Sequence, residues 1–217
     1  MKKFKLTKET INFRGHKLHR IRALRDFSGV KKGDLGGFIE SEANLAHEGN
    51  CWVYGDARVY GNARVLYDAR VGSKATVYGD VVVCGRAQVY GNAEVGDNAW
   101  VGENARVSDN AWVYGNASVG HNAHIFGDAW VSGEARVGGD AQVERTSDYV
   151  VFKNWWSSGR HFTWTRSNNA WSVGCFYGTS EQLIAKAYKD SEESGREYER
   201  VVKYVESILA DARTERQ

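Results

Sequence analysis

Apolar positions recur every six residues along the middle of the chain, from Val53 to Val143. One column holds Val at each sixth position, with Ile125 as the one exception. The column two residues earlier holds Ala from residue 57 onward, with Val81 as the one exception. Residues two apart point to the same face of a β-strand, so each Ala and Val pair faces one side and the residue between them faces the other. Gly-Asp or Gly-Asn pairs then follow, as expected where a chain turns. Such a period predicts a parallel β-helix built from short strands.

An aliphatic residue is followed four positions later by a small one, as from Val53 to Ala57 and from Val95 to Ala99. This spacing resembles that of the left-handed parallel β-helix, or hexapeptide-repeat, family. The resemblance implies triangular coils of three hexads, about 18 residues each, and about six coils over residues 35–145. A coiled coil and an antiparallel sheet are the alternatives, but neither has a period of six.

Coils of this length predict two specific sets of contacts. Trp112 and Trp130 should lie one strand apart on an outer face of the prism. Val101, Val119 and Val137 should stack on one another inside it.

The N-terminal segment differs from the repeat in its charge. Residues 1–32 contain eleven Lys or Arg and two Asp or Glu, a net charge of +9, which leaves −7 for the rest of a chain whose net charge is +2. Alternating apolar residues around a turn at residues 14–17 predict a basic β-hairpin. Residues 1–34 are therefore expected to cap the first coil and cover its edge. Attraction of a polyanion is the alternative. An insertion of two residues near His47 then interrupts the period before Cys51.

The repeat ends before residue 146, and residues 146–217 are expected to form a small α+β domain with three strands and two helices. Thr179 and Gln182 have the spacing of a capping box, which predicts the start of the first helix. A break at Ser194-Gly195 precedes the second helix, which carries an apolar stripe. The strands expected are Tyr149–Lys153, Arg160–Thr165 and Trp171–Cys175.

Composition narrows the classes of function. The chain has 217 residues, of which 24 are Gly, 8 are Trp and none is Pro. No apolar run is long enough for a membrane span, no secretory signal follows the basic start, and three widely separated cysteines suit a reducing cytoplasm. The sequence shows no metal-ligand spacing, phosphate-binding loop or nucleophile motif. We therefore expect a cytoplasmic protein without a metal or cofactor and without a membrane or nucleic-acid partner.

Segments near the start of the chain also resemble hexapeptide-repeat proteins of phages and prophages. The segments KLTKET, ALRDF and VKKGDLGGFIE carry this resemblance, and the tail shares it. It implies a viral or prophage origin and, for such a protein, the cytoplasm of the host cell. The names common in that group follow the repeat and imply no mechanism.

Many members of the left-handed β-helix family transfer acyl groups from CoA or acyl-carrier thioesters, usually as trimers with sites between neighbouring prisms. A His on the prism wall commonly acts there as general base on the acceptor. The resemblance makes His121 and His124 the candidates, because they are the histidines of residues 51–143. Two solvated surface histidines are the alternative. The same segment also lacks the long insertions that build acceptor pockets in those enzymes.

The aromatic residues favour binding instead. Trp100, Trp112 and Trp130 occupy outward positions, which predicts a surface for self-association, with a homotrimer as the usual form in the family. In the tail, indole rings and guanidinium groups can hold a flat anion by stacking and charge. Tryptophan as core filler is the alternative there. The ligand-binding residues predicted in the tail are Trp156, Arg160, Trp164, Arg166 and Trp171.

Three functions remain open. The favoured one is a non-catalytic, oligomeric binding or assembly protein of phage origin that sequesters a nucleotide-like or other small anionic ligand. The second is an acyl-CoA-dependent O- or N-acyltransferase with a CoA thioester as co-substrate and His121 or His124 as base. The third is a purely structural protein.

Overall fold

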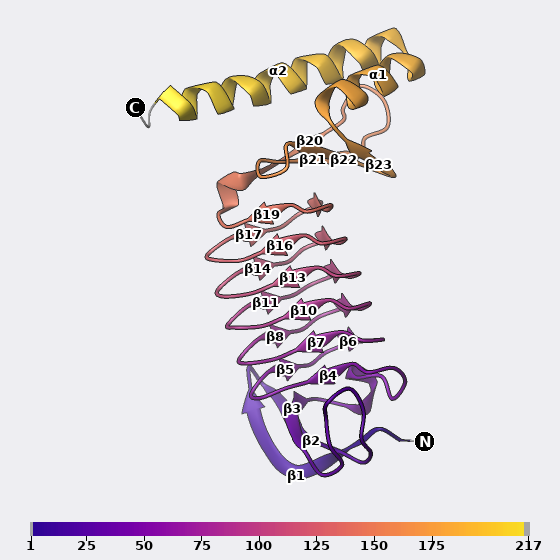
Figure 1. Cartoon of the computed structure of the whole chain (residues 1–217), viewed down its shortest axis with the longest axis vertical. Coiled ribbons are helices and arrows are strands. Elements are labelled where there is room, and N and C mark those ends of the chain that lie inside the picture. The colour runs from indigo at the N-terminus through magenta and orange to yellow at the C-terminus, as the bar shows by residue number, and fades with distance from the viewer. Residues whose placement is uncertain (1, 215–217) are drawn as a thin grey trace.

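The computed structural model describes residues 2–214, and three parts follow one another along its long axis (Figure 1). Antiparallel strands cover the lower end of a coil of short parallel strands, and a small sheet with two helices covers the upper end. The predicted fold class is confirmed: the protein is mainly β, with a β-solenoid of about six turns. The left-handed sense of the coil stays a prediction.

Sixteen strands of two residues each form the β-solenoid. Each strand pairs in parallel with the strand three further along the chain, so that Trp52 lies beside Arg70 and Gln88 beside Arg106. Pairing with the third strand along confirms the coil of three hexads. The strands are β4 (Trp52–Val53), β5 (Arg58–Val59), β6 (Arg64–Val65), β7 (Arg70–Val71), β8 (Thr76–Val77), β9 (Val82–Val83), β10 (Gln88–Val89), β11 (Glu94–Val95), β12 (Trp100–Val101), β13 (Arg106–Val107), β14 (Trp112–Val113), β15 (Ser118–Val119), β16 (His124–Ile125), β17 (Trp130–Val131), β18 (Arg136–Val137) and β19 (Gln142–Val143).

The two inward columns fill the inside of the coil. Each of their residues is at most 2% exposed, so small and β-branched side chains together form one continuous apolar core. Val101, Val119 and Val137 are paired in register, as predicted. Trp112 and Trp130 also pair as predicted, and their rings stack with centroids 5.3 Å apart.

The lower end contains β1 (Phe4–Phe13), β2 (His16–Ala23), β3 (Leu35–Ile39) and the 3-10 helix η1 (Glu42–Asn44). β1 and β2 form the predicted hairpin, β2 pairs with β3, and β3 enters the solenoid beside β5. Ile39 pairs with Val59, and Val59 pairs in turn with Val77. The sequence separation between Ile39 and Val59 is two residues longer than that between Val59 and Val77. These two extra residues confirm the predicted insertion in the first coil.

The two ends of the solenoid expose different backbone groups. The backbone N–H groups that join neighbouring coils all donate to a carbonyl one coil nearer the C-terminus, as from Arg58 to Ala75. The first coil therefore leaves carbonyl oxygens without strand partners, and the last coil leaves N–H groups. The lower cap has to supply hydrogen-bond donors and the upper cap has to supply acceptors.

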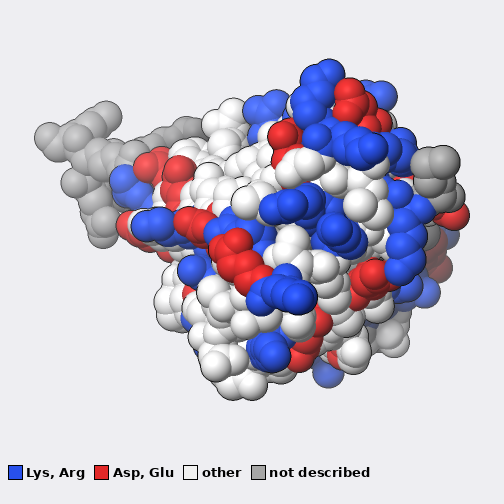
Figure 2. Space-filling view, turned by 90° about the horizontal axis from the view of Figure 1, so that it is seen from below, with Lys and Arg blue, Asp and Glu red and all other residues white. Residues whose placement is uncertain are grey.

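Basic side chains satisfy the carbonyl edge at the lower end. The ammonium group of Lys3, which is fully buried, donates to the carbonyl of Cys51 at 2.8 Å. Arg20 donates to the carbonyls of Gly36 and Gly55 at 3.0 and 3.2 Å. Figure 2 shows many Lys and Arg side chains over this end, interleaved with Asp and Glu. The carbonyl edge thus gives a physical reason for part of the charge of this cap.

The upper end contains the 3-10 helix η2 (Thr146–Asp148), β20 (Tyr149–Lys153), β21 (His161–Thr165), β22 (Ala170–Val173), β23 (Phe176–Gly178), α1 (Ser180–Asp190) and α2 (Glu192–Thr214). The four strands form an antiparallel sheet above the last coil, and both helices lie on the far side of that sheet (Figure 1). Within the described residues, neither helix is both long and apolar enough to cross a membrane.

Side-chain oxygens satisfy the N–H edge at this end. The hydroxyl of Thr163 accepts from the backbone N–H of Arg136 at 2.8 Å, and the hydroxyl of Ser167 accepts from that of Gln142 at 2.7 Å. The hydroxyl of Thr146 serves a further N–H of the last coil. The C-terminal domain is therefore a cap whose chemistry complements that of the lower end.

Two details of the tail correct the sequence prediction. The sheet has four strands rather than three, because the short β23 pairs with β22. The second helix begins at Glu192 rather than after Gly195, since the hydroxyl of Ser191 accepts from the backbone N–H of Ser194 and caps the helix there. Gly195 lies inside the helix, where a Cβ would come within 2.2 Å of the Tyr188 ring, so this glycine serves helix packing rather than a break.

Candidate functional site

A column of glycines opens a niche at one corner of the upper coils. Gly102, Gly120 and Gly138 each follow the inward Val of their coil, and none of them has the positive φ that favours glycine. Glycine is needed at these positions because neighbouring side chains leave too little space for a Cβ. A Cβ on Gly102 would lie 2.1 Å from the indole of Trp100, and one on Gly138 would lie 3.2 Å from Nδ1 of His121. Trp100 therefore lies across the glycine column, half-buried, rather than projecting into solvent.

His121 borders this niche together with Glu103, which lies one coil below. Both occupy corner positions with positive φ, 55° and 56°. Oε2 of Glu103 lies 3.4 Å from Nδ1 of His121 and also accepts a hydrogen bond from the backbone N–H of His121. A carboxylate at this place favours the tautomer with hydrogen on Nδ1, which leaves Nε2 of the imidazole as a proton acceptor.

The C-terminal domain forms the roof of the niche. Tyr177 of β23 stacks on His121, with ring centroids 6.1 Å apart, and its hydroxyl accepts from the amide of Asn168 at 2.9 Å. Burial, and next the charge of Asp140, raises the pKa of Tyr177, so its phenol stays a neutral donor. The free thiol of Cys175 is exposed in the turn between β22 and β23. We call this space of about 280 Å³ the corner niche; it is lined by Trp100, Glu103, Gly120, His121, Arg136, Gly138 and Tyr177, among others.

A basic cleft continues from the corner niche. Arg136, Gly174 and Cys175 line both spaces, and the cleft extends to Arg160 and His161 with a volume of about 370 Å³. Arg136 donates to the carbonyl of Gly174 at 3.3 Å, which ties the solenoid wall to the roof. Two guanidinium groups along one cleft are suited to phosphate groups, because each can donate two parallel hydrogen bonds.

His124 does not belong to the corner niche. It lies on the face formed by β13, β16 and β19, where its Nε2 is 2.9 Å from the hydroxyl of Ser108 and its ring stacks on Phe126. Burial, and next the charge of Arg106, lowers its pKa. It opens to a separate groove, and no carboxylate lies within 4.0 Å of its ring among the described residues. The two histidines that the sequence offers as candidates therefore lie in different parts of the solenoid surface.

Two tryptophans of the predicted ligand site are core residues, which corrects their predicted role. Trp164 and Trp171 face each other across β21 and β22 and are 2% and 0% exposed. Their indole N–H groups donate to Asn169 and Ser180, so neither ring offers a face or a free donor to a ligand. They pack against α1 and α2 because that face of the sheet is the one that the helices cover.

The other three residues of the predicted ligand site lie in different surroundings and do not form one site. Trp156 is half-buried and packs edge-to-face on Tyr198, with ring centroids 5.0 Å apart. Arg166 lies within 3.9 Å of the carboxylate of Asp148, so its charge is balanced within the protein. Arg160 is exposed and lines both the basic cleft and a pocket beneath the helices.

The three outward tryptophans do not form one surface. Trp112 and Trp130 lie on the face of β14 and β17, and Trp130 is 50% exposed. Trp100 lies on the face of β12, where its ring covers glycines. The three rings therefore do not form one surface: Trp112 and Trp130 are a stacked pair, and Trp100 lies apart from them on another face.

Sequence reasoning missed Glu103, Tyr177 and Arg136. Glu103 and His121 stand exactly three hexads apart in the sequence, and this spacing was sufficient to pair them, because residues one coil apart stack. Over residues 2–214, no three His, Cys, Asp or Glu side chains come together in a way that could hold a metal ion.

The solenoid and its six-residue period define a β-solenoid repeat protein. Four stretches, residues 52–67, 57–73, 87–103 and 105–121, match the model described as the YdcK β-solenoid repeat. The last two stretches end on Glu103 and His121. The chain is also similar to a protein of Escherichia coli strain K12 named "Uncharacterized acetyltransferase YdcK", with 51% identity over 37 residues. That match spans 17% of this chain and 11% of the length of the Escherichia coli protein. Part of the solenoid is thus similar to YdcK-type repeats, and the phage origin stays a prediction.

Proposed function

We propose that this protein transfers an acyl group from a CoA thioester to a hydroxyl or amine, with the corner niche as its active site. The observation that carries the proposal is the pair of His121 and Glu103 on the solenoid wall, with Nδ1 of the imidazole against the carboxylate. A His oriented by a carboxylate is a common general base. The name of the Escherichia coli relative supports the same class of reaction.

In the proposed reaction, Nε2 of His121 removes the proton of the acceptor as its oxygen or nitrogen attacks the carbonyl carbon of the thioester. A new C–O or C–N bond forms and the C–S bond breaks. The thiolate of CoA leaves and takes the proton from the imidazolium. Glu103 stabilises the positive charge that develops on His121.

The basic cleft supports a CoA thioester as the acyl donor. CoA carries several phosphate groups, and Arg136 and Arg160 stand along a cleft that opens directly from the niche. Arg136 lines both spaces, so a donor whose phosphates lie in the cleft has its other end near His121. The niche beside Trp100 and His121 has a volume of about 280 Å³, which gives room for an acyl group close to the wall.

The test is CoA release from acetyl-CoA in the presence of a panel of hydroxyl and amine acceptors. Free CoA is measured by chromatography, because a thiol reagent would also react with the exposed Cys175. We expect His121→Asn to lower the rate about 10²–10⁴-fold, since general base catalysis is lost. Glu103→Gln should lower it about tenfold to a hundredfold, because the imidazolium that forms loses the nearby negative charge. Equal rates for wild type and both variants, or no transfer to any acceptor, would contradict the proposal.

A second candidate function is capture of a small anion without chemistry. It is supported by the pocket between the C-terminal sheet and the two helices, which is lined by Lys186 and by Arg160, a residue that also lines the basic cleft.

A further inference from the structure

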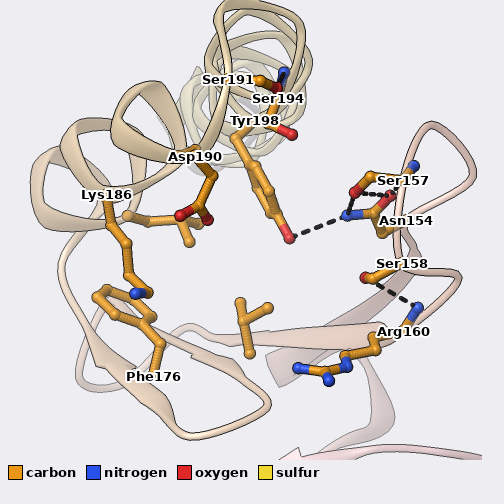
Figure 3. A pocket seen from close by; sticks show the side chains of 13 residues that line it. Asn154, Ser157, Ser158, Arg160, Phe176, Lys186, Asp190, Ser191, Ser194 and Tyr198 are labelled. Carbon is orange, nitrogen blue, oxygen red and sulfur yellow. Dashed lines mark hydrogen bonds between the residues drawn. The ribbon is translucent and has the colours of Figure 1, made fainter.

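The C-terminal domain contains a pocket of its own, separate from the corner niche. It has a volume of about 350 Å³ and lies between the ends of α1 and α2, the turn after β22 and the loop that follows β20 (Figure 3). This volume is at the low end for small-molecule sites, which occupy about 300–1,000 Å³. The pocket thus has the size for a small metabolite.

One hydroxyl that lines this pocket makes no hydrogen bond with the part of the chain that the structure describes. Ser194 is 8% exposed and lines the pocket. Its backbone N–H donates to Ser191, but its side-chain oxygen makes no hydrogen bond among the residues that the structure describes. Its Oγ is not among the buried side-chain atoms that lack a partner, so it stays accessible from the pocket and can donate to or accept from a polar ligand there.

A second hydroxyl projects into the pocket as a donor. Nδ2 of Asn154, whose side chain is buried, donates to the hydroxyl of Tyr198 at 3.3 Å and to that of Ser157 at 2.9 Å (Figure 3). The phenol of Tyr198 accepts this bond and keeps its own hydrogen for a ligand. Burial raises the pKa of Tyr198, which keeps the phenol protonated.

Charges stand on opposite sides of the pocket. Arg160 lies on the strand side, near Ser158, whereas Lys186 and Asp190 lie on the side of α1 (Figure 3). Among the described residues, none of these three side chains is within 4.0 Å of an opposite charge. The protein therefore leaves both cations and the carboxylate available to a ligand, with an excess of one positive charge.

We propose that this pocket binds a small phosphorylated polyol. The guanidinium of Arg160 would hold the phosphate through two charge-assisted hydrogen bonds, with the Tyr198 hydroxyl as a further donor. The ligand hydroxyls would donate to Asp190 and meet the unpartnered hydroxyl of Ser194 on the opposite side. A phosphate at one end and hydroxyls at the other match the two sides of the pocket better than an inorganic anion does. The proposal rests on the second candidate function, and the pocket shares Arg160 with the basic cleft but does not contain His121.

Calorimetric titration tests the proposal with glycerol 3-phosphate, ribose 5-phosphate and glucose 6-phosphate. Inorganic phosphate and glucose serve as the two partial probes. We expect saturable binding of at least one phosphorylated polyol, and at least about tenfold weaker binding of both partial probes. Arg160→Ala should weaken the polyol phosphate at least about tenfold. Asp190→Asn should weaken it too but leave inorganic phosphate unchanged.

Lys189→Ala is the matched control, because Lys189 is exposed on α1 and does not line the pocket. It should keep the wild-type affinity, and thermal melting should show that all variants are folded. Binding should also persist in His121→Asn, which separates this site from the proposed catalytic one. Absence of binding by all three polyol phosphates would overturn the proposal. Equal affinity for inorganic phosphate, or wild-type affinity in Arg160→Ala, would also overturn it.

Discussion

Neighbouring residues of the repeat differ in the substitutions that they tolerate, because one side chain faces the buried core and the next faces solvent. Val101 is fully buried between the valines of the adjacent coils. Arg106, five residues on, is exposed on its face of the solenoid. The same substitution should therefore have opposite consequences at these two positions.

We expect Val101→Asp to abolish soluble expression. A carboxylate there has no partner and no water, and the cost of burying it is several kcal/mol, a large part of the about 5–15 kcal/mol that stabilises a typical domain. Arg106→Asp introduces the same side chain on the surface and should stay soluble. The measurement is the soluble fraction of each variant after expression, and equal fractions would show that the core is not closed at Val101.

The proposed catalytic pair, Glu103 and His121, could be predicted from the sequence, but the roof of the niche could not. Glu103 stands three hexads before His121, so the period alone was enough to stack them. Tyr177 and Cys175 reach the niche through the docking of a separate domain onto the last coil, and no local pattern encodes that placement. Trp164 and Trp171 lie opposite each other in the paired strands β21 and β22, and their face of the sheet is buried only because the two helices pack on it.

At the level of elements, the polarity of the coil determines the chemistry of its caps. The last coil presents N–H groups, and hydroxyls of the C-terminal domain accept from them. Thr163 is 1% exposed and serves the backbone N–H of Arg136. Loss of its hydroxyl leaves a donor unsatisfied at a dry interface.

Thr163→Val should lower the free energy of unfolding by about 1–3 kcal/mol, since the shape is retained and one buried donor is orphaned. Thr10→Val, on the exposed part of β1, is the control and should change it by less than about 0.5 kcal/mol. Urea denaturation measures both. An unchanged midpoint in Thr163→Val would contradict the capping role of the domain.

The lower cap contains a pH-sensitive link. Glu40 accepts from the backbone N–H of Gly61 at 2.7 Å and lies 2.9 Å from Nδ1 of His16. The hydrogen bond from His16, and next that from Gly61, lowers the pKa of Glu40 below its ordinary value of 4.5. A carboxyl with a lowered folded-state pKa adds stability above the unfolded value, and that stability is lost as pH falls through the folded value.

We therefore expect the melting temperature to fall more steeply below pH 4.5 in the wild type than in Glu40→Gln. The amide can still accept from Gly61 but does not titrate. The measurement is thermal melting followed by circular dichroism from pH 7 to pH 3. Parallel curves for the two proteins would show that Glu40 does not link the hairpin to the first coil.

The lengths of the elements explain which of them could be predicted from sequence patterns. Sixteen repeats of one pattern left no ambiguity in the solenoid. The strand β23 has only three residues and includes Gly178, too short for alternation to be recognised. Glycine is a poor helix former, so Gly195 predicts a helix break, but the close approach of Tyr188 requires a residue without a side chain there.

For the whole molecule, the stacked pair of Trp112 and Trp130 leaves apolar area on one face of the prism. Trp130 is 50% exposed, and Tyr114 packs edge-on against it. A symmetric trimer, the form implied by the family resemblance, would cover this face. Light scattering at micromolar concentration should then give three times the chain mass of 24.3 kDa, and Trp130→Ala should shift the protein toward the monomer. A wild-type protein with the mass of one chain would contradict the prediction.

The proposed acyl transfer at the corner niche is assigned to His121 and not to His124. His121 has a carboxylate beside Nδ1 and a basic cleft beside it, whereas His124 contacts a serine hydroxyl on another face. The most direct test compares CoA release from acetyl-CoA by His121→Asn and His124→Asn under identical conditions. We predict a loss of about 10²–10⁴-fold in the first variant and a rate within about twofold of wild type in the second. A wild-type rate in His121→Asn, or an equal loss in both variants, would contradict the assignment of the active site.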